Sequence, residues 1–133
     1  MTSPRSTRPP RVVVADDHEW IRTILVQVAR QTLPLAEVVE TADGQQALEA
    51  CHTGPCDFLI TNHAMPHMDG TELTRVVRAA SPDLPILMVS IHPSVKTEAL
   101  AAGANWFLTK EQIMEHMPPI LLSHTRGGTA AEN

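Results

Sequence analysis

No apolar stretch in the 133 residues approaches the roughly 20 that a membrane-spanning helix needs, and no signal-peptide segment follows the N-terminus. Cysteine is scarce: Cys51 and Cys56 are too few for a disulfide framework and fit a reducing cytoplasm. The net charge of −5, with few and scattered basic residues, argues against a nucleic-acid surface. We therefore expect a cytoplasmic protein that binds neither membrane nor nucleic acid directly.

What is present favours one folded domain. The sequence is 43% hydrophobic and 19% charged, which allows a core and does not indicate disorder. Residues 1–10 hold three prolines and no apolar period, so we interpret them as a flexible leader, followed by a domain over residues 11–124 and a tail over residues 125–133. A short basic run near the start is interpreted as solvated: Arg5, Arg8 and Arg11.

Five short apolar runs predict strands, and the continuous runs among them suit strands that are buried on both faces of a parallel sheet. They lie at residues 11–15, around 38–39, at 58–61, at 85–89 and at 106–108.

Helical periodicity fills the intervals between these runs. Asp43 with Gln46, and Asp69 with Glu72, resemble capping boxes that open the second and third helices. Ser94 is expected to cap a fourth helix, which stops at Gly103. In the last helix, prolines 118 and 119 are expected to cause a kink or a restart.

Strand–helix alternation repeated five times predicts an open parallel sheet with helices on both faces. Ligands bind such sheets outside the carboxyl ends of the strands. Polar residues follow four of the predicted strands at that edge: Asp16 with Asp17, then Asn62, Ser90 and Lys110. This convergence indicates a binding site.

The chemistry of these residues indicates a phosphoryl group and its metal. Adjacent carboxylates raise each other's pKa unless a cation offsets them, and Mg²⁺ is usually held by one or two carboxylates with water and phosphate. Lys110 supplies a second positive charge, and Ser90 a hydroxyl donor, for phosphoryl oxygens.

Four motifs, in order, resemble the receiver domain of two-component response regulators. They are Asp16-Asp17-His18, residues 57–70, the Ser90 strand end, and residues 103–110. The resemblance covers about residues 11–124. The Asp-Asp-His opening, and the Lys-Glu pair after the last strand, look most like the subfamily that often carries helix-turn-helix output domains.

This resemblance implies a flavodoxin-like α/β fold: a three-layer, doubly wound, five-stranded parallel sheet in the order 2-1-3-4-5, with five helices. It implies that Asp16, Asp17 and the backbone carbonyl of Ala64 bind Mg²⁺. Asn62 falls at the phospho-acceptor position, and Ser90 and Lys110 in the phosphoryl pocket. Phe107 would be the switch aromatic, although a plain core aromatic is an equal alternative.

Asn62 departs from the family pattern, because an aspartate there accepts phosphate from a histidine kinase. An amide is a poor nucleophile and cannot form the acyl phosphate. Its neutrality removes a negative charge from the metal site, so we expect Mg²⁺ binding to be weak or absent. Lys110 is then free to pair directly with Asp16 or Asp17.

Other residues near the site have two interpretations each. Trp106 is either an anchor on a partner surface or packed against a helix. A homodimer is expected through the face of the fourth helix, fifth strand and fifth helix, including Trp106. Trp20 is expected at a buried helix position, with the pocket rim as the alternative. Surface loop positions are expected for three histidines: His18, His63 and His67. A metal site formed by cysteines 51 and 56 with nearby histidines is not expected, because the spacing matches no zinc pattern.

The leading hypothesis is a non-enzymatic binding module: a receiver not phosphorylated at Asn62 that works by contact with a protein, such as a sensor histidine kinase or an output protein. Too few residues follow the fifth strand for a helix-turn-helix, so transcription regulation would need a partner or a further segment. An ordinary receiver into which Asn62 was introduced remains an alternative. A flavodoxin-like enzyme or nucleotide binder is disfavoured, because carboxylates stand where a Gly-rich phosphate loop would be needed.

Overall fold

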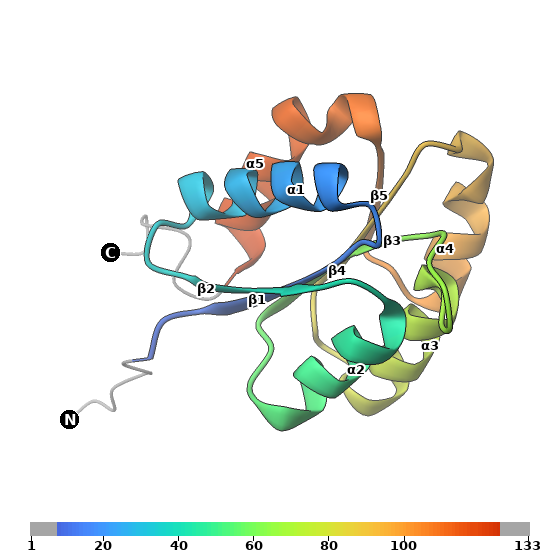
Figure 1. Ribbon diagram of the computed structural model, residues 1–133, viewed down its shortest axis with the longest axis horizontal. Helices are drawn as coiled ribbons and strands as arrows, with labels where there is room; N and C mark the ends of the chain where they lie inside the picture. Colours follow the sequence, from blue (N-terminus) through green and yellow to red (C-terminus); the bar gives the residue numbers. More distant parts are fainter. Residues whose placement is uncertain (1–7, 126–133) are drawn as a thin grey trace.

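The sheet consists of five parallel strands in the order β2-β1-β3-β4-β5, as predicted (Figure 1). The computed structural model describes residues 8–125; the parts of the predicted leader and tail at 1–7 and 126–133 lie outside the described residues. The strands are β1 (Arg11–Ala15), β2 (Glu37–Thr41), β3 (Phe58–Asn62), β4 (Ile86–Ser90) and β5 (Trp106–Thr109). Every residue of β3 and β4 is buried, which explains why both strands form uninterrupted apolar runs.

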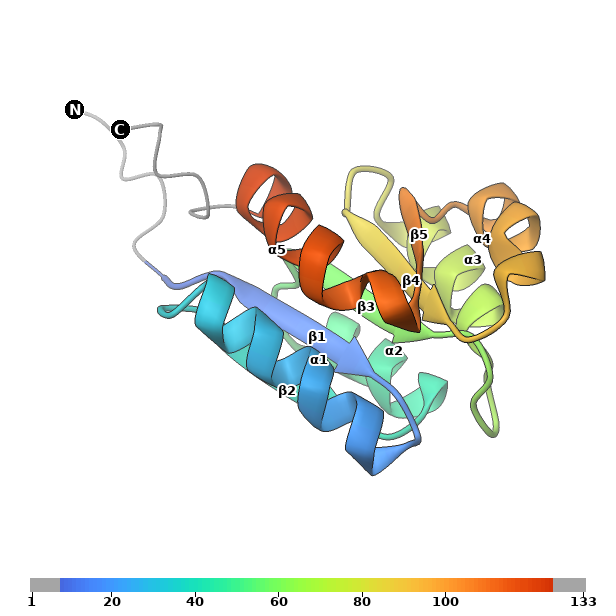
Figure 2. The same cartoon turned by 90° about the horizontal axis from the view of Figure 1, so that it is seen from above.

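Helices cover both faces of this sheet. They are α1 (Glu19–Thr32), α2 (Gly44–Thr53), α3 (Gly70–Ala80), α4 (Lys96–Ala102) and α5 (Ile113–His124). Figure 1 shows α1 and α5 on one face and α2, α3 and α4 on the other, and Figure 2 shows α1 and α5 side by side above the strands. No helix within residues 8–125 has the length and apolar character that crossing a membrane requires.

Strand alternation builds a separate hydrophobic core under each helix layer. In β1, Val12 and Val14 pack towards α1 and α5, whereas Val13 and Ala15 pack towards α2 and α3. Successive side chains of a strand point to opposite faces, so one short run supplies both cores. The strand ends are thereby fixed from both sides, which is what a site built on them needs.

Two helix starts follow the predicted caps. The carboxylate of Asp43 accepts a hydrogen bond from Gln46 N at 2.8 Å, and the Gln46 side chain accepts one from Ala42 N at 2.9 Å. At α3, Asp69 accepts from Glu72 N at 2.9 Å. Each cap satisfies a backbone N–H that the helix leaves without a partner.

One expectation about the helices was wrong, and of the kink or restart expected in the last helix the restart does not occur. Ser94 does not cap α4; it lies inside a 3₁₀ turn, Pro93–Val95, and α4 begins at Lys96 without a side-chain cap. α5 does not restart at prolines 118 and 119, but includes both in one helix from Ile113 to His124. Three buried residues hold α5 on the sheet and offset the backbone hydrogen bonds that the prolines remove: Ile113, Met117 and Leu121.

The basic residues at the start of the domain have partners within the chain. Arg8 donates to both carboxylate oxygens of Asp57, at 2.8 and 3.1 Å, and Arg11 N donates to the same carboxylate at 2.8 Å. Pro10 is buried, and its carbonyl accepts from Glu37 N. The folded part therefore includes these residues, and two of the three arginines contact the domain instead of being solvated.

Candidate functional site: the carboxyl edge of the sheet

Four strands end at the same edge of the sheet. In the ladder, Ala15 lies beside Thr61, Asn62 beside Val89, and Ser90 beside Thr109. The residues that follow or end the strands therefore meet. A cavity of about 270 Å³ at this edge is lined by four of the predicted site residues, together with neighbours from α1 and the β4–α4 loop: Asn62, Ala64, Ser90, Lys110, His18, Trp20, Ile21, Ile91 and His92.

Asp16 is fully buried directly after β1. Its Oδ1 accepts a hydrogen bond from His18 N at 2.9 Å, whereas its Oδ2 has no hydrogen-bond partner. Arg22, one turn into α1, donates from Nη1 to the backbone carbonyl of Asp16 at 2.7 Å and so fixes the strand end. Sequence analysis missed Arg22, because an arginine on an amphipathic helix carries no local signal of its target.

Burial raises the pKa of the Asp16 carboxyl, because the charged form is separated from water. The negative charge of Asp17 raises this pKa further, while the His18 N–H and the charge of Lys110 lower it. Among the described residues, Lys110 forms no ion pair within 4.0 Å. It therefore acts on Asp16 at a distance, and the expected direct pairing is not formed.

This carboxylate pair suits a divalent cation. Ligand atoms of Asp16, Asp17 and His18 lie within 4.8 Å of one another, and the buried Asp16 Oδ2 has no hydrogen-bond partner. Hard cations such as Mg²⁺ prefer carboxylate oxygens. Within residues 8–125, the cysteines and the nearby histidines form no such ligand group.

Asn62 uses its amide group inside the pocket. The side chain is 5% exposed, and Nδ2 donates a hydrogen bond to the carbonyl of Ala64 at 2.9 Å. A carboxylate cannot donate in this way, and it would repel that carbonyl oxygen. The amide N–H of Asn62 is therefore directed at the carbonyl oxygen of Ala64, which the family resemblance assigns as a metal ligand.

Two glycines position the loop that follows Asn62. A Cβ at Gly70 would overlap the carbonyl oxygen of Asn62, and a Cβ at Gly44 would overlap that of Met68. Gly70 N also donates to His63 O at 2.7 Å, and His67 takes a φ of 68°, which is uncommon for a residue with a side chain. The loop is therefore clamped between the first residues of α2 and α3.

Ser90 and Lys110 occupy the other side of the cavity. Ser90 Oγ accepts a hydrogen bond from His92 N at 3.0 Å, which keeps the hydroxyl at the strand end. Lys110 lies within a capping box formed by Thr109 and Gln112, in which Thr109 N donates to Gln112 Oε1 at 3.0 Å. Sequence analysis missed this box, although its Thr-x-x-Gln spacing was present.

The aromatic residues lie outside the polar part of the site. Trp20 is 71% exposed and lines the cavity rim, so the expected buried position was wrong. Trp106 stacks on Phe58, with ring centroids 5.8 Å apart, and lies 4.7 Å from His124. Of the two interpretations of Trp106, a partner anchor or packing within the domain, the second therefore applies. Phe107 is partly buried against the core under α3 and α4, and does not line the cavity at the strand ends.

A doubly wound α/β domain with an acid pair, an amide, a hydroxyl and a lysine at four strand ends fits one class of signalling module, the receiver. Residues 12–121 match the response regulator receiver domain family, and the chain belongs to this family. It is therefore a receiver domain of the two-component signal-transduction type, and its relatives include transcription regulators.

Three relatives illustrate the similarity. The chemotaxis protein CheY of Pseudomonas aeruginosa is 36% identical over 104 residues, which cover 75% of this chain and 83% of that protein. The transcriptional regulatory protein NarL of Mycobacterium tuberculosis is 31% identical over 119 residues, covering 88% of this chain but 55% of that protein. The solved receiver domain of NarL from M. tuberculosis has a TM-score of 0.76 at 32% identity, covering 87% of this chain and 95% of that domain.

Proposed function

We propose that this chain is a receiver that is not phosphorylated at position 62 and that acts through protein contacts, without enzymatic activity of its own. The observation that carries the proposal is the buried amide of Asn62 at the end of β3, hydrogen-bonded to Ala64. A neutral amide cannot accept a phosphoryl group as a carboxylate does. The rest of the receiver pocket remains, so the fold can still present a partner surface.

For the metal, we propose weak binding of Mg²⁺ by Asp16, Asp17 and the carbonyl of Ala64. The unpartnered Oδ2 of Asp16 favours a cation, but the site has one carboxylate fewer than the family pattern, and the Ala64 carbonyl already accepts from Asn62. A bound Mg²⁺ would supply positive charge to phosphoryl oxygens. Ser90 and Lys110 would hold those oxygens, with Phe107 as the switch aromatic.

The proposed partners are a sensor histidine kinase or an output protein, in the cytoplasm. The pocket rim offers exposed apolar side chains for such contact, since Trp20 is 71% and Ile91 62% exposed. A homodimer through α4, β5 and α5 remains part of the proposal. Because Trp106 is stacked on Phe58, this face would rely on other residues than Trp106.

An alternative is an ordinary phospho-accepting receiver in which Asn62 was introduced. It is favoured by the completeness of the pocket around Asn62, since Asp→Asn is nearly isosteric. The sequence of the encoding gene in its source distinguishes the two. A nucleotide-binding function is disfavoured by the acidic turn after β1, which would repel phosphate.

The test is the intact mass of the protein after incubation with Mg²⁺ and a small phosphodonor, beside Asn62→Asp. We expect the variant to gain one phosphoryl group and the unchanged chain to gain none. Ser90→Ala in the Asn62→Asp background is the matched control, because it removes the hydroxyl proposed to hold the phosphoryl oxygens and should slow the gain.

Two results would contradict the proposal. Phosphorylation of the unchanged chain would show that another residue accepts the group. No gain by Asn62→Asp, with its circular dichroism spectrum unchanged, would show that the pocket lacks phosphoryl chemistry altogether.

A further inference from the structure

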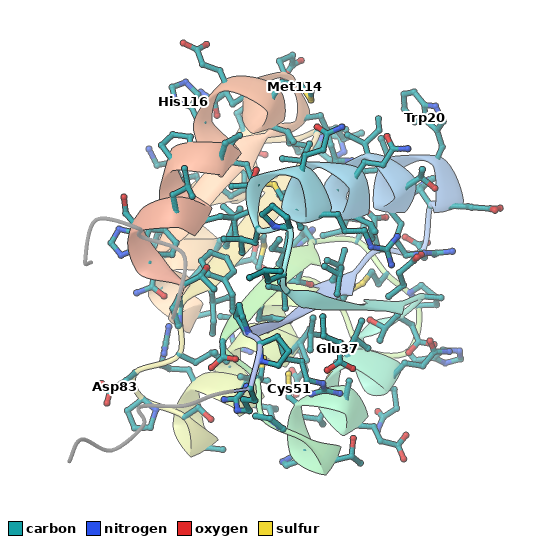
Figure 3. All side chains as sticks on the ribbon, turned by 90° about the vertical axis from the view of Figure 1, so that its left-hand side faces the viewer. Trp20, Glu37, Cys51, Asp83, Met114 and His116 are labelled. Carbon is teal, nitrogen blue, oxygen red and sulfur yellow. The ribbon has the colours of Figure 1, made fainter. Side chains whose placement is uncertain are left out.

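A pair of thiols lies at the opposite end of β3 from Asn62. Cys51 is in the last turn of α2, and Cys56 is in the turn that leads into β3. The two Sγ atoms are 3.6 Å apart and share a hydrogen bond. Both cysteines are half-buried, so they pack against the core while part of each residue is exposed to solvent. Figure 3 labels Cys51 on the α2 side of the sheet.

Arg11 fixes the turn that brings the thiols together. Its Nη1 donates to the carbonyl of Ala50 at 3.0 Å and to that of Pro55 at 2.7 Å. These carbonyls belong to the residues immediately before Cys51 and Cys56. A Cβ at Gly54 would come within 3.1 Å of the Arg11 guanidinium, so the cation lies directly against the turn. One side chain thus holds the backbone on the approach to both cysteines.

The two thiols differ in their electrostatic surroundings. The hydrogen bond between the two thiols and the charge of Arg11 lower the pKa of the Cys51 thiol, although burial opposes them. The hydrogen bond with Cys51 raises the pKa of the Cys56 thiol, and burial and the negative charge of Cys51 raise it further. Only the thiolate is a nucleophile, so Cys51 is the attacking group and Cys56 the resolving group.

We propose that Cys51 and Cys56 form a dithiol–disulfide pair that is oxidised by small-molecule disulfides of the glutathione class. A disulfide requires the sulfur atoms to approach to about 2.05 Å, a shift that side-chain rotation from the hydrogen-bonded distance can supply. The site lies outside the phosphoryl pocket and does not depend on the proposed function.

The exchange occurs in two steps that balance. The Cys51 thiolate attacks one sulfur of the small disulfide, whose S–S bond breaks and releases one thiolate. Cys56 then loses its proton and attacks the Cys51 sulfur of the mixed disulfide, releasing the second thiolate. The two cysteines lose two electrons in total, and the small disulfide gains them as two thiols.

The test uses the full chain equilibrated in glutathione buffers of increasing oxidised fraction, quenched with acid and analysed by intact mass and peptide mapping. We expect a species that has lost two hydrogens, with a Cys51–Cys56 cross-link. Cys56→Ser should instead accumulate the mixed disulfide at Cys51, because no resolving thiol remains. Cys51→Ser should react slowly with glutathione.

Alkylation rates test the roles of the two thiols in the unchanged chain. With limiting iodoacetamide at neutral pH, we expect Cys51 of the unchanged chain to be labelled at least about tenfold faster than Cys56. Arg11→Gln should slow the labelling of Cys51 while its circular dichroism spectrum remains that of the folded protein.

Three results would overturn the proposal. They are equal labelling of the two thiols, a persistent mixed disulfide in the unchanged chain, and no reaction at any glutathione ratio.

Discussion

At the scale of single residues, the buried side chains of Asn62 and Asp16 differ in whether their polar atoms have hydrogen-bond partners. Asn62 is buried with its amide satisfied by Ala64, whereas Asp16 is buried with one oxygen that has no partner. The first arrangement is neutral and stable by itself. The second arrangement lowers the free energy of unfolding, and a bound cation would offset this loss. The pocket therefore keeps a carboxylate that opposes folding at neutral pH.

We predict that Asp16→Asn raises the free energy of unfolding by about 1 kcal/mol at neutral pH in a buffer with a chelator. Burial raises the pKa of Asp16, so the folded state holds this proton more tightly than the unfolded state does. Stability of the unchanged chain then falls as pH rises from about 4, the ordinary pKa of an aspartate, through the raised value. Urea unfolding at several pH values measures the difference.

The gain should disappear below about pH 4, where the carboxyl is protonated in both states. The matched control is Asp83→Asn, at an exposed position labelled in Figure 3, which should change stability by less than about 0.5 kcal/mol. An Asp16→Asn variant that is no more stable at neutral pH would mean that this carboxylate is compensated.

At the scale of elements, the site could be predicted because each of its strands ends at a polar residue or is followed by one. Buried parallel strands have apolar sequences, so the polar residues Asn62 and Ser90 identified the ends of β3 and β4 from the sequence alone. Asp43 and Asp69 were predictable for the same local reason, since an N-cap bonds to a residue three positions away.

Features set by distant contacts were not predictable. The start of α4 depends on the 3₁₀ turn Pro93–Val95, not on Ser94 alone. Trp20 lies within an amphipathic pattern, but it is exposed although α1 packs beside α5. The pairing of Arg8 with Asp57 spans 49 positions. In each case tertiary contact overrides or supplements local propensity.

The helix α5 provides a prediction at this scale. Pro119 is exposed in the middle of α5, and helix geometry gives it no N–H to donate to the carbonyl of Glu115. Pro119→Ala should therefore raise the free energy of unfolding by about 2 kcal/mol, the helix penalty of proline less its effect on the unfolded chain. Thermal and urea unfolding measure the change.

Ser123→Ala, exposed in the same helix, is the control and should change stability by less than about 0.5 kcal/mol. A loss of stability in Pro119→Ala would indicate that the proline makes a necessary contact or that α5 has unusual geometry at this position.

At the scale of the whole molecule, a receiver that is not phosphorylated at Asn62 should not change its oligomeric state in response to a phosphoryl group. Beryllium fluoride is a mimic of the phosphoryl group. When it is added with Mg²⁺, we expect the unchanged chain to keep its oligomeric state in solution. Asn62→Asp should move towards a dimer, because its carboxylate can bind the mimic. Size-exclusion chromatography with light scattering measures both.

A shift in the unchanged chain would contradict the silent role of Asn62. A second result would be that Asn62→Asp gains a phosphoryl group by intact mass and still keeps its oligomeric state. That result would rule out the proposed homodimer, but not the proposal that Asn62 prevents phosphorylation.

The two tryptophans lie in contrasting surroundings. Trp20 is 71% exposed at the rim of the cavity, whereas Trp106 is stacked on Phe58 and contacts His124 inside the layer under α5. The intrinsic fluorescence of this protein is therefore a sum of two signals with different meanings. The exposed indole of Trp20 reports on whatever occupies the pocket, while that of Trp106, partly buried and stacked on Phe58, reports on whether the domain is folded.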